Sequence, residues 1–215
     1  MAHPLVSIIL ATYNRSDLLP RAVDSVLMQS WHNWELLIVD DGSTDGTPAL
    51  LEEFDRLDMR VRVFRPERAG GRPKGPGPAR NRGLRESYGD LVTVLDSDDA
   101  YAVDHLNLRV RYMIDHPEVD FIYGGYRAIG NDAQMLVPDL EDPSIMIPLD
   151  ECIIGGTFFT RRGVIERAGG WESGYGEDAR LFSRIRAGFV VRKVDYPTYL
   201  YHRDTIDSRC SRMVG

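Results

Sequence analysis

The sequence predicts an α/β fold in which a mostly parallel sheet is covered by helices on both faces. Over the first hundred residues, short β-branched runs alternate with amphipathic segments, which is typical of strands joined by crossover helices. The 215 residues, with 43% hydrophobic and 27% charged side chains, suit one folded domain with a large core. Acidic or Asn-containing turns follow three of the expected strands, so their side chains should meet at one edge of the sheet.

The first half is expected to contain four strands and four helices in alternation. Leu19, Val23 and Val26 recur at helical spacing and mark the apolar face of the first helix. Proline is tolerated in the first turn of a helix, and Pro117 ends the last of these helices. The expected strands are 6–11, 35–40, 61–65 and 91–95, and the expected helices are 17–29, 48–57, 78–87 and 103–116.

The pattern changes after residue 116, where we expect a smaller α+β half that supplies a second wall to any site. Residues 121–129 and 134–137 are expected to form a hairpin around a turn at 130–132. A Pro-rich connection follows over 139–148. The remaining expected elements are helices over 162–168 and 177–187 and a strand over 189–194.

Composition and charge exclude several classes of protein. A net charge of -7 disfavours nucleic-acid binding, which depends on a cationic surface. The apolar runs are far shorter than the ~20 residues that cross a bilayer, and no basic region precedes a long apolar stretch. Cys152 and Cys210 lie far apart and are interpreted as plain thiols of a reducing compartment. We therefore expect a cytoplasmic protein without a transmembrane segment.

One local segment is strongly basic despite the acidic balance of the chain. Between Arg65 and Arg85 there are seven cationic residues and a single acid, Glu67, which indicates a small anionic ligand. The loop 70–78 inside this segment is rich in Gly and Pro but matches neither the dinucleotide fingerprint nor the P-loop. It either contacts phosphate through its side chains and the following helix start, or is a solvated insertion.

The motif Asp96-Ser97-Asp98-Asp99 directly follows the expected strand 91–95. Three carboxylates in four residues repel one another unless a cation or hydrogen-bond donors compensate. A divalent metal that prefers oxygen ligands is the natural compensation at the end of a strand. The alternative is a solvated turn that caps the next helix.

A second acidic turn, 41–46, follows the strand 35–40 and formally matches a calcium-binding loop that ends at Glu52. We reject this match because a β-branched run precedes the turn where a helix would be needed, and because Pro48 falls within the ligand loop. The preferred interpretation is a strand-to-helix turn in which Asp40 or Asp41 accepts a hydrogen bond from a ring N–H of a ligand. A turn without a ligand is the alternative.

Together these segments resemble the family 2 glycosyltransferases, which have the GT-A fold. The order and spacing of four blocks agree over roughly the first 115 residues, namely 6–15, 39–47, 79–84 and 95–99. In the second half, residues 155–157, 169–171, 176–178 and His202 resemble the glycine loop, the Gly-Gly-aromatic turn, the catalytic acidic pair and the C-terminal histidine of that family. The resemblance implies an inverting enzyme that uses a nucleotide-diphosphate sugar.

The resemblance also implies roles for individual residues of the first half. Asp41 would bind the base, Arg80 the nucleotide or diphosphate, and Asp96 the ribose or the water shell of the metal. Asp98 would coordinate Mn2+ or Mg2+, whose charge offsets the charge that develops on the leaving diphosphate. The residues expected to bind the nucleotide sugar are Thr12, Tyr13, Asn14, Arg15, Asp41, Arg80, Asp96 and Ser97.

In the second half, the resemblance makes Asp178 the general base that takes a proton from the acceptor hydroxyl. His202 would be a further metal or phosphate ligand, although a lone histidine is as often a packed or exposed ring. Trp171 would stack on acceptor sugar, or else belong to the core. The residues expected near the acceptor or the donor sugar are Gly156, Thr157, Trp171 and Glu177.

We therefore expect a single GT-A domain over 1–215, divided into a nucleotide-sugar half at 1–115 and an acceptor half at 116–203. The tail 204–215 would be disordered or close over the donor. The expected donor is a UDP-sugar, and the expected acceptor is a hydroxyl of a sugar, glycan or lipid-linked glycan; a lipid-linked acceptor would bring the protein to a membrane surface. The alternatives are an inactive sugar-nucleotide-binding module and a nucleotidyltransferase, which would usually carry a Gly-rich basic loop after its first strand.

Overall fold

A seven-stranded sheet forms the body of the computed structural model, which describes residues 3–66, 73–130, 135–139, 142 and 144–204. The strand order is β11-β6-β10-β4-β1-β2-β3. Of the six neighbouring pairs in this order, the two that β10 forms with β4 and β6 are antiparallel, and the other four are parallel. The strands are β1 (Val6–Thr12), β2 (Trp34–Asp40), β3 (Val61–Phe64), β4 (Leu91–Val94), β6 (Phe121–Tyr123), β10 (Phe159–Arg161) and β11 (Val191–Lys193).

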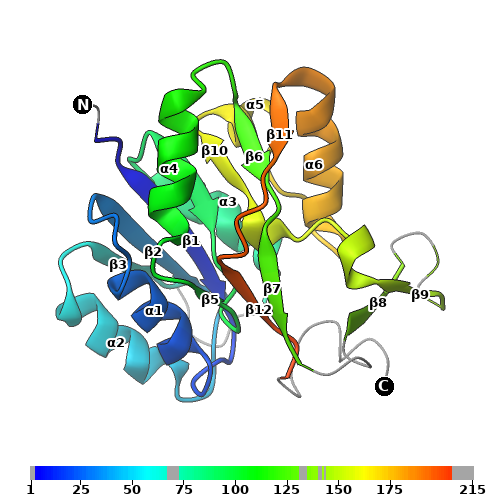
Figure 1. Cartoon of the computed structure of the whole chain (residues 1–215). Coiled ribbons are helices and arrows are strands. Elements are labelled where there is room, and N and C mark those ends of the chain that lie inside the picture. Colours follow the sequence, from blue (N-terminus) through cyan, green and yellow to red (C-terminus); the bar gives the residue numbers. More distant parts are fainter. Residues whose placement is uncertain (1–2, 67–72, 131–134, 140–141, 143, 205–215) are drawn as a thin grey trace.

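Helices cover both faces of this sheet (Figure 1). Side chains alternate across β1, so Ile8 and Leu10 belong to one hydrophobic cluster and Ile9 to the other. The first cluster includes residues of α1 (Leu19–Leu27), α2 (Thr47–Leu57) and α4 (His105–Asp115). The second includes residues of α3 (Pro76–Glu86), α5 (Val164–Arg167) and α6 (Glu177–Gly188). The predicted fold class is confirmed.

The central strands position the site because their carboxyl ends finish at one edge of the sheet. All seven residues of β2 are buried, and β1 pairs with it in parallel from Val6 opposite Trp34 to Thr12 opposite Asp40. On the other side, β1 pairs in parallel with β4, where Ile9 lies opposite Val94. The turns that follow β1, β2 and β4 are therefore neighbours in space.

The second half contains two smaller sheets, and here the expected hairpin between 121–129 and 134–137 is wrong. Gly124 and Gly125, with φ of +93° and +70°, divide the first segment in two. The Arg109 guanidinium donates hydrogen bonds to both of their carbonyl groups, at 2.9 and 3.3 Å. The observed strands are β5 (Ala100–Tyr101), β7 (Tyr126–Ile129) and β12 (Tyr199–His202) in one sheet, and β8 (Leu136–Pro138) and β9 (Met146–Pro148) in the other.

β8, which overlaps the expected strand 134–137, pairs antiparallel with β9 at the end of the Pro-rich connection, and β7 pairs in parallel with β12 instead. In Figure 1, the β8–β9 hairpin extends from the lower right of the main body. Two 3-10 turns, η2 (Leu149–Glu151) and η3 (Gly155–Thr157), lead from it to β10. The sequence did not predict β5, β10 or β12, which are only two to four residues long.

Some residues for which the sequence analysis makes predictions lie outside the described ranges. They are Arg68 and Arg72 of the basic loop, the turn residues 131 and 132, and 205–215 of the tail with Cys210. Over the described ranges, each helix is too short or too polar to cross a membrane.

Candidate functional site

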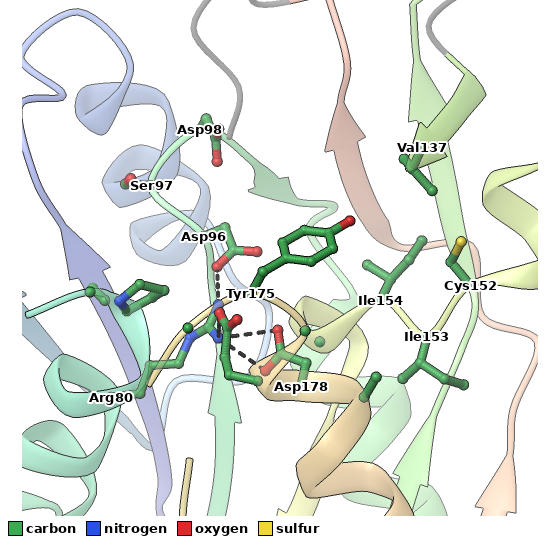
Figure 2. A pocket seen from close by; sticks show the side chains of 18 of the residues that line it. Arg80, Asp96, Ser97, Asp98, Val137, Cys152, Ile153, Ile154, Tyr175 and Asp178 are labelled. Carbon is green, nitrogen blue, oxygen red and sulfur yellow. Dashed lines mark hydrogen bonds and ion pairs between the residues drawn. The ribbon is translucent and has the colours of Figure 1, made fainter. Parts of the chain in front are cut away.

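A cavity of about 780 Å3 opens at the carboxyl ends of β1, β2 and β4. Its two sides differ in chemistry, as Figure 2 shows: charged side chains gather on one side and apolar ones on the other. Eleven of the residues predicted for the site line this cavity, and these are Thr12, Tyr13, Arg15, Asp41, Arg80, Asp96, Ser97, Asp98, Glu177, Asp178 and His202.

The turns after β1 and β2 are joined by hydrogen bonds, which fix the rim of the cavity. Asn14 has a left-handed backbone with φ of +50°, and its amide donates to Ser43 Oγ at 2.9 Å. Its side-chain Oδ1 accepts a bond of 2.8 Å from the Thr44 amide. The Arg15 amide donates to Thr47 Oγ1 at 2.9 Å. Asn14 thus builds the rim and is not itself among the cavity-lining residues.

The two adjacent acids after β2 have different surroundings. Asp40 is buried, and its Oδ1 accepts bonds from the amide and the hydroxyl of Ser43, at 3.0 and 2.6 Å. The carboxylate of Asp41 accepts bonds from the amides of Lys74 and Gly75, at 3.0 and 2.6 Å. Asp40 therefore supports the turn, whereas Asp41 lines the cavity and holds the segment that starts α3.

The adjacent acids Asp98 and Asp99 after β4 also have different surroundings: Asp99 holds the turn in place, and Asp98 lines the cavity. Asp99 is buried, and it accepts hydrogen bonds from Tyr199 Oη at 2.5 Å and from the His202 amide at 2.7 Å. These bonds attach β12 to the turn and bring His202 to the cavity wall. Asp98 lines the cavity itself, and burial next to Asp96 raises the pKa of its carboxyl group, partly opposed by Arg15 and Arg21.

Asp98 and His202 both line the cavity and are the candidate ligands for a divalent metal. A cation would relieve the charge of the half-buried Asp98 carboxylate, whose pKa is raised by burial and by Asp96. His202 Nδ1 lies 3.1 Å from Asp204 Oδ1, an arrangement that orients a ligating imidazole in metal sites and leaves Nε2 for the ion. Within the described ranges, no group of three or more His, Cys, Asp or Glu side chains is arranged to hold a metal ion.

Arg80 links three carboxylates at the base of the cavity (Figure 2). Its side chain is only 4% exposed. Nη2 lies 2.5 Å from Asp96 Oδ1, while Nη1 lies 2.9 and 3.1 Å from the two oxygens of Asp178 and 3.3 Å from Glu177 Oε1. The guanidinium is therefore engaged by acids from both halves of the chain, a contact that local sequence motifs do not predict.

Burial and the Arg80 cation act in opposite directions on the pKa of the Asp178 carboxyl group. Burial raises the pKa of its carboxyl group, and the nearby carboxylates of Glu177 and Asp96 add to the increase. Arg80 and a 2.8 Å hydrogen bond from Trp171 Nε1 act in the opposite direction, but the net pKa shift is upward. Asp178 is thus a stronger base than an ordinary aspartate.

Three residues expected near the acceptor or donor sugar lie behind the cavity wall. Trp171 is buried in the cluster that packs against α6. Thr157 is buried, donates to the Ile154 carbonyl at 2.7 Å and accepts a bond from the Gly124 amide at 3.0 Å. A Cβ on Gly156 would lie 2.1 Å from Tyr199 Oη. In this structure they support the wall and do not line the cavity.

The apolar side of the cavity was not predicted. It comes from the β8–β9 hairpin and the segment that follows, and Tyr175 Oη reaches across to donate to the Pro138 carbonyl at 3.1 Å. These apolar residues are spaced irregularly among prolines and acids, so no periodicity indicated a shared surface. The apolar side chains are Val137, Ile147, Leu149, Ile153 and Ile154.

Residues 7–167 match the model of Glycosyl transferase family 2. The chain belongs to this family. It is 36% identical over 129 residues to UDP-Glc:alpha-D-GlcNAc-diphosphoundecaprenol beta-1,3-glucosyltransferase WfgD of Escherichia coli, a match that covers 60% of this chain and 48% of WfgD. The chain spans about half the length of the first curated relatives that it matches.

Solved structures share the fold of this family 2 chain. The crystal structure of S. aureus TarS 1-349 in complex with UDP-GlcNAc superposes with a TM-score of 0.75 at 18% identity, covering 96% of this chain and 60% of TarS 1-349. The mannosyltransferase PcManGT from Pyrobaculum calidifontis, in complex with GDP-Man and Mn2+, gives a TM-score of 0.70 at 21% identity, covering 92% and 56% of the two chains. These likenesses confirm the GT-A type of fold.

Proposed function

We propose that this chain is a metal-dependent inverting glycosyltransferase that moves a sugar from a nucleotide-diphosphate sugar to an acceptor hydroxyl. The observation that carries this proposal is the arrangement of the acids in one cavity. Asp98 and His202, the proposed metal ligands, line the same cavity as Asp178, the proposed base, which is joined to Asp96 through Arg80. Membership of family 2 supports the same reaction.

The donor is proposed to bind against the turns after β1, β2 and β4. Thr12 Oγ1 is buried without a hydrogen-bond partner among the described residues and lines the cavity, so it can bind a polar group of the ligand. Asp41 is proposed to accept a bond from the base. A UDP-sugar is the favoured donor, since UDP-Glc appears in the name of WfgD and UDP-GlcNAc is bound in TarS.

Asp98 and His202 are proposed to hold Mn2+ or Mg2+, and PcManGT, which has the same fold, is solved with Mn2+. The metal, when bound, supplies positive charge next to the leaving diphosphate. Asp98 contributes an anionic oxygen, and Asp204 orients the imidazole of His202. Arg15 also lines the cavity and adds a second positive charge for the phosphates.

Asp178 is proposed to take the proton of the acceptor hydroxyl as its oxygen bonds to the anomeric carbon of the donor. The bond between that carbon and the diphosphate oxygen breaks at the same time, and its electron pair leaves with the nucleotide diphosphate. The proton ends on the Asp178 carboxylate. A single displacement of this kind inverts the anomeric configuration. The upward pKa shift of Asp178, caused mainly by burial, strengthens the base.

The acceptor is proposed to enter along the side formed by β8, β9 and the segment after them. Residues 1–115 would then serve as the nucleotide-sugar half and 116–203 as the acceptor half of one domain. A sugar, a glycan or a lipid-linked glycan is the proposed acceptor class, and the name of WfgD includes a diphosphoundecaprenol acceptor. We propose a cytoplasmic location, with attachment to a membrane surface if the acceptor is lipid-linked. The comparisons lend no support to the inactive-module or nucleotidyltransferase alternatives.

A screen of nucleotide diphosphates and nucleotide sugars by thermal shift, with and without Mn2+, tests the donor assignment. Binding to the folded state raises the apparent melting temperature, so we expect the largest increase for one nucleotide with Mn2+ present. Release of the nucleotide diphosphate is then measured with sugar and polyprenyl-diphosphate sugar acceptors, and NMR of the product gives its anomeric configuration. Strong donor binding without release on any acceptor would favour a binding module, and a product with retained configuration would exclude the single displacement.

A further inference from the structure

The carboxylate of Asp178 is held from three directions. Both oxygens face Arg80 Nη1, at 2.9 and 3.1 Å, and Trp171 Nε1 donates to Oδ1 at 2.8 Å. The third contact is the backbone of Gly155. These three residues come from α3, the turn before α6 and η3, so three separate elements of the fold converge on one side chain.

Gly155 provides space that another residue would fill. A Cβ at this position would lie 2.1 Å from Asp178 Oδ2 and 2.2 Å from its Cγ. Separations under 3.0 Å are not tolerated between such atoms, so the carboxylate packs directly on the glycine. Gly155 does not have a positive φ, which means that alanine would conflict with Asp178 and not with the backbone conformation.

Arg80 does more than neutralise one acid. Its second nitrogen, Nη2, is 2.5 Å from Asp96 Oδ1, in the turn after β4. The planar guanidinium presents its donors in a fixed fork, so the position of the Asp178 carboxylate is tied to that of Asp96. Lysine would keep the charge but could not reproduce both contacts with one rigid group.

We propose that Arg80, Trp171 and Gly155 are positioning residues that fix the Asp178 carboxylate, and that Arg80 ties it to Asp96 so that the donor and acceptor sides share one ion-pair network. This inference rests on the proposed role of Asp178 as the general base. A base must be held within a fraction of an ångström of its productive geometry, and a displacement of about 1 Å can cost about 100-fold in rate. The three contacts meet that requirement.

The charged groups around Asp178 predict opposite effects for two substitutions. Arg80 faces it from α3, Glu177 from its own helix and Asp96 from the turn after β4. Loss of the Arg80 cation should raise the pKa of Asp178 further, whereas loss of the Glu177 carboxylate should lower it. Because the ionised form is the active base, the acid limb of the rate profile should move to higher pH in Arg80→Gln and to lower pH in Glu177→Gln.

The first experiment measures kcat, the donor KM and the carbon-13 NMR titration of Asp178 in these variants. We expect Arg80→Gln to reduce kcat about 100-fold and Arg80→Lys about 10-fold, with a donor KM within about threefold of the original. Arg82→Gln is the matched control, because Arg82 lies on the same helix and bonds to the Arg65 carbonyl outside the cavity. It should leave both kcat and the titration unchanged.

Removal of the buried Arg80 cation leaves three acids without their shared partner, which can unfold the chain. Trp171→Phe and Gly155→Ala therefore test the same proposal while Arg80 stays in place. Gly155→Ala should lower kcat about 100-fold, and Gly188→Ala, where a Cβ would meet nothing within 4 Å, should not. In the Asp178→Ala background, Gly155→Ala should cause no further loss, because its conflict is with that carboxylate.

Two outcomes separate this inference from the proposed function. If Asp178→Asn keeps full transfer, the base assignment fails and the positioning role fails with it. If Asp178→Asn is inactive while Gly155→Ala and folded Arg80→Gln keep the original kcat and the original Asp178 titration, the positioning role alone is overturned. Both the base assignment and the positioning role are supported if kcat falls in the Arg80 and Gly155 variants and if the pKa of Asp178 rises in Arg80→Gln and falls in Glu177→Gln.

Discussion

The two sides of the cavity are built in different ways. The donor side consists of turns that follow buried parallel strands, and those turns are joined to each other through Asn14, Ser43 and Thr47. The acceptor side depends on a two-stranded hairpin of three-residue strands, β8 and β9, and on 3-10 turns. The polar turns of the donor side suit a ligand that is the same in every reaction cycle. The short elements of the acceptor side can change the shape of the cavity with few substitutions. The following predictions test this division.

The largest effect on kcat is expected at Asp178, which lies between the donor side and the acceptor side. Asp178→Asn keeps the shape of the side chain but removes the base, so kcat should fall about 1,000-fold or more. The affinity for the nucleotide should change little, because the donor side is intact. Steady-state kinetics and calorimetry on the same preparation measure both quantities; a parallel loss of kcat and nucleotide affinity would show that the two sides are not separable.

On the donor side, Ser43→Ala should reduce the free energy of unfolding by about 1–3 kcal/mol, because it removes a partner from buried Asp40 and from the Asn14 amide. The nucleotide affinity should fall with it, and the acceptor KM should not. Ser144→Ala is the matched control, since its hydroxyl bonds to Asp142 on the exposed surface. Urea denaturation gives the stabilities, and equal losses in the two variants would contradict the assigned role of Ser43.

On the acceptor side, Val137→Ala removes apolar surface from the cavity wall. We expect the acceptor KM to rise up to about tenfold, the size of effect that a small hydrophobic deletion has in a binding pocket. The donor KM serves as the internal control and should stay constant. A change confined to the donor KM would mean that the two sides have been assigned the wrong way round.

The smallest effect is expected in the pH dependence. The raised pKa of Asp178 means that its protonation begins at a higher pH than in an ordinary aspartate, whose pKa is 3.8. Protonation removes the base, so kcat should decline as the pH falls through this raised value and be fully present above it. A profile of kcat between about pH 3 and 8 measures the decline. An acid limb at or below pH 3.8 would contradict the cause assigned here, which is burial.

The same contrast explains how far the sequence could predict the molecule. The strands β1, β2 and β4 were predictable because each couples an apolar run to a polar turn, and parallel strands bring such turns together. The contact of Arg80 with Asp178, 98 positions later, was not, since no local pattern fixes how the halves pack. Strands of three residues, such as β10, carry too few alternating side chains to be recognised.

In the second half of the chain, the sequence located the site motifs but did not predict which of their side chains face the cavity. The glycine loop and the Gly-Gly-aromatic turn were located by their motifs, but a motif does not tell which side chains face a cavity. Thr157 satisfies its hydroxyl within the wall, and Trp171 packs in the core while its Nε1 reaches Asp178. Both positions are decided by tertiary packing.

The central claim is that Asp98 holds a cation that strengthens the binding of a nucleotide diphosphate. Calorimetric titration of UDP into the protein, with and without Mn2+, tests it directly in the original chain, in Asp98→Ala and in the exposed control Asp115→Ala. We predict that Mn2+ increases the UDP affinity about tenfold or more in the original chain and in Asp115→Ala, and not in Asp98→Ala. A Mn2+ effect that survives in Asp98→Ala, or that is missing from the original chain, would contradict the claim.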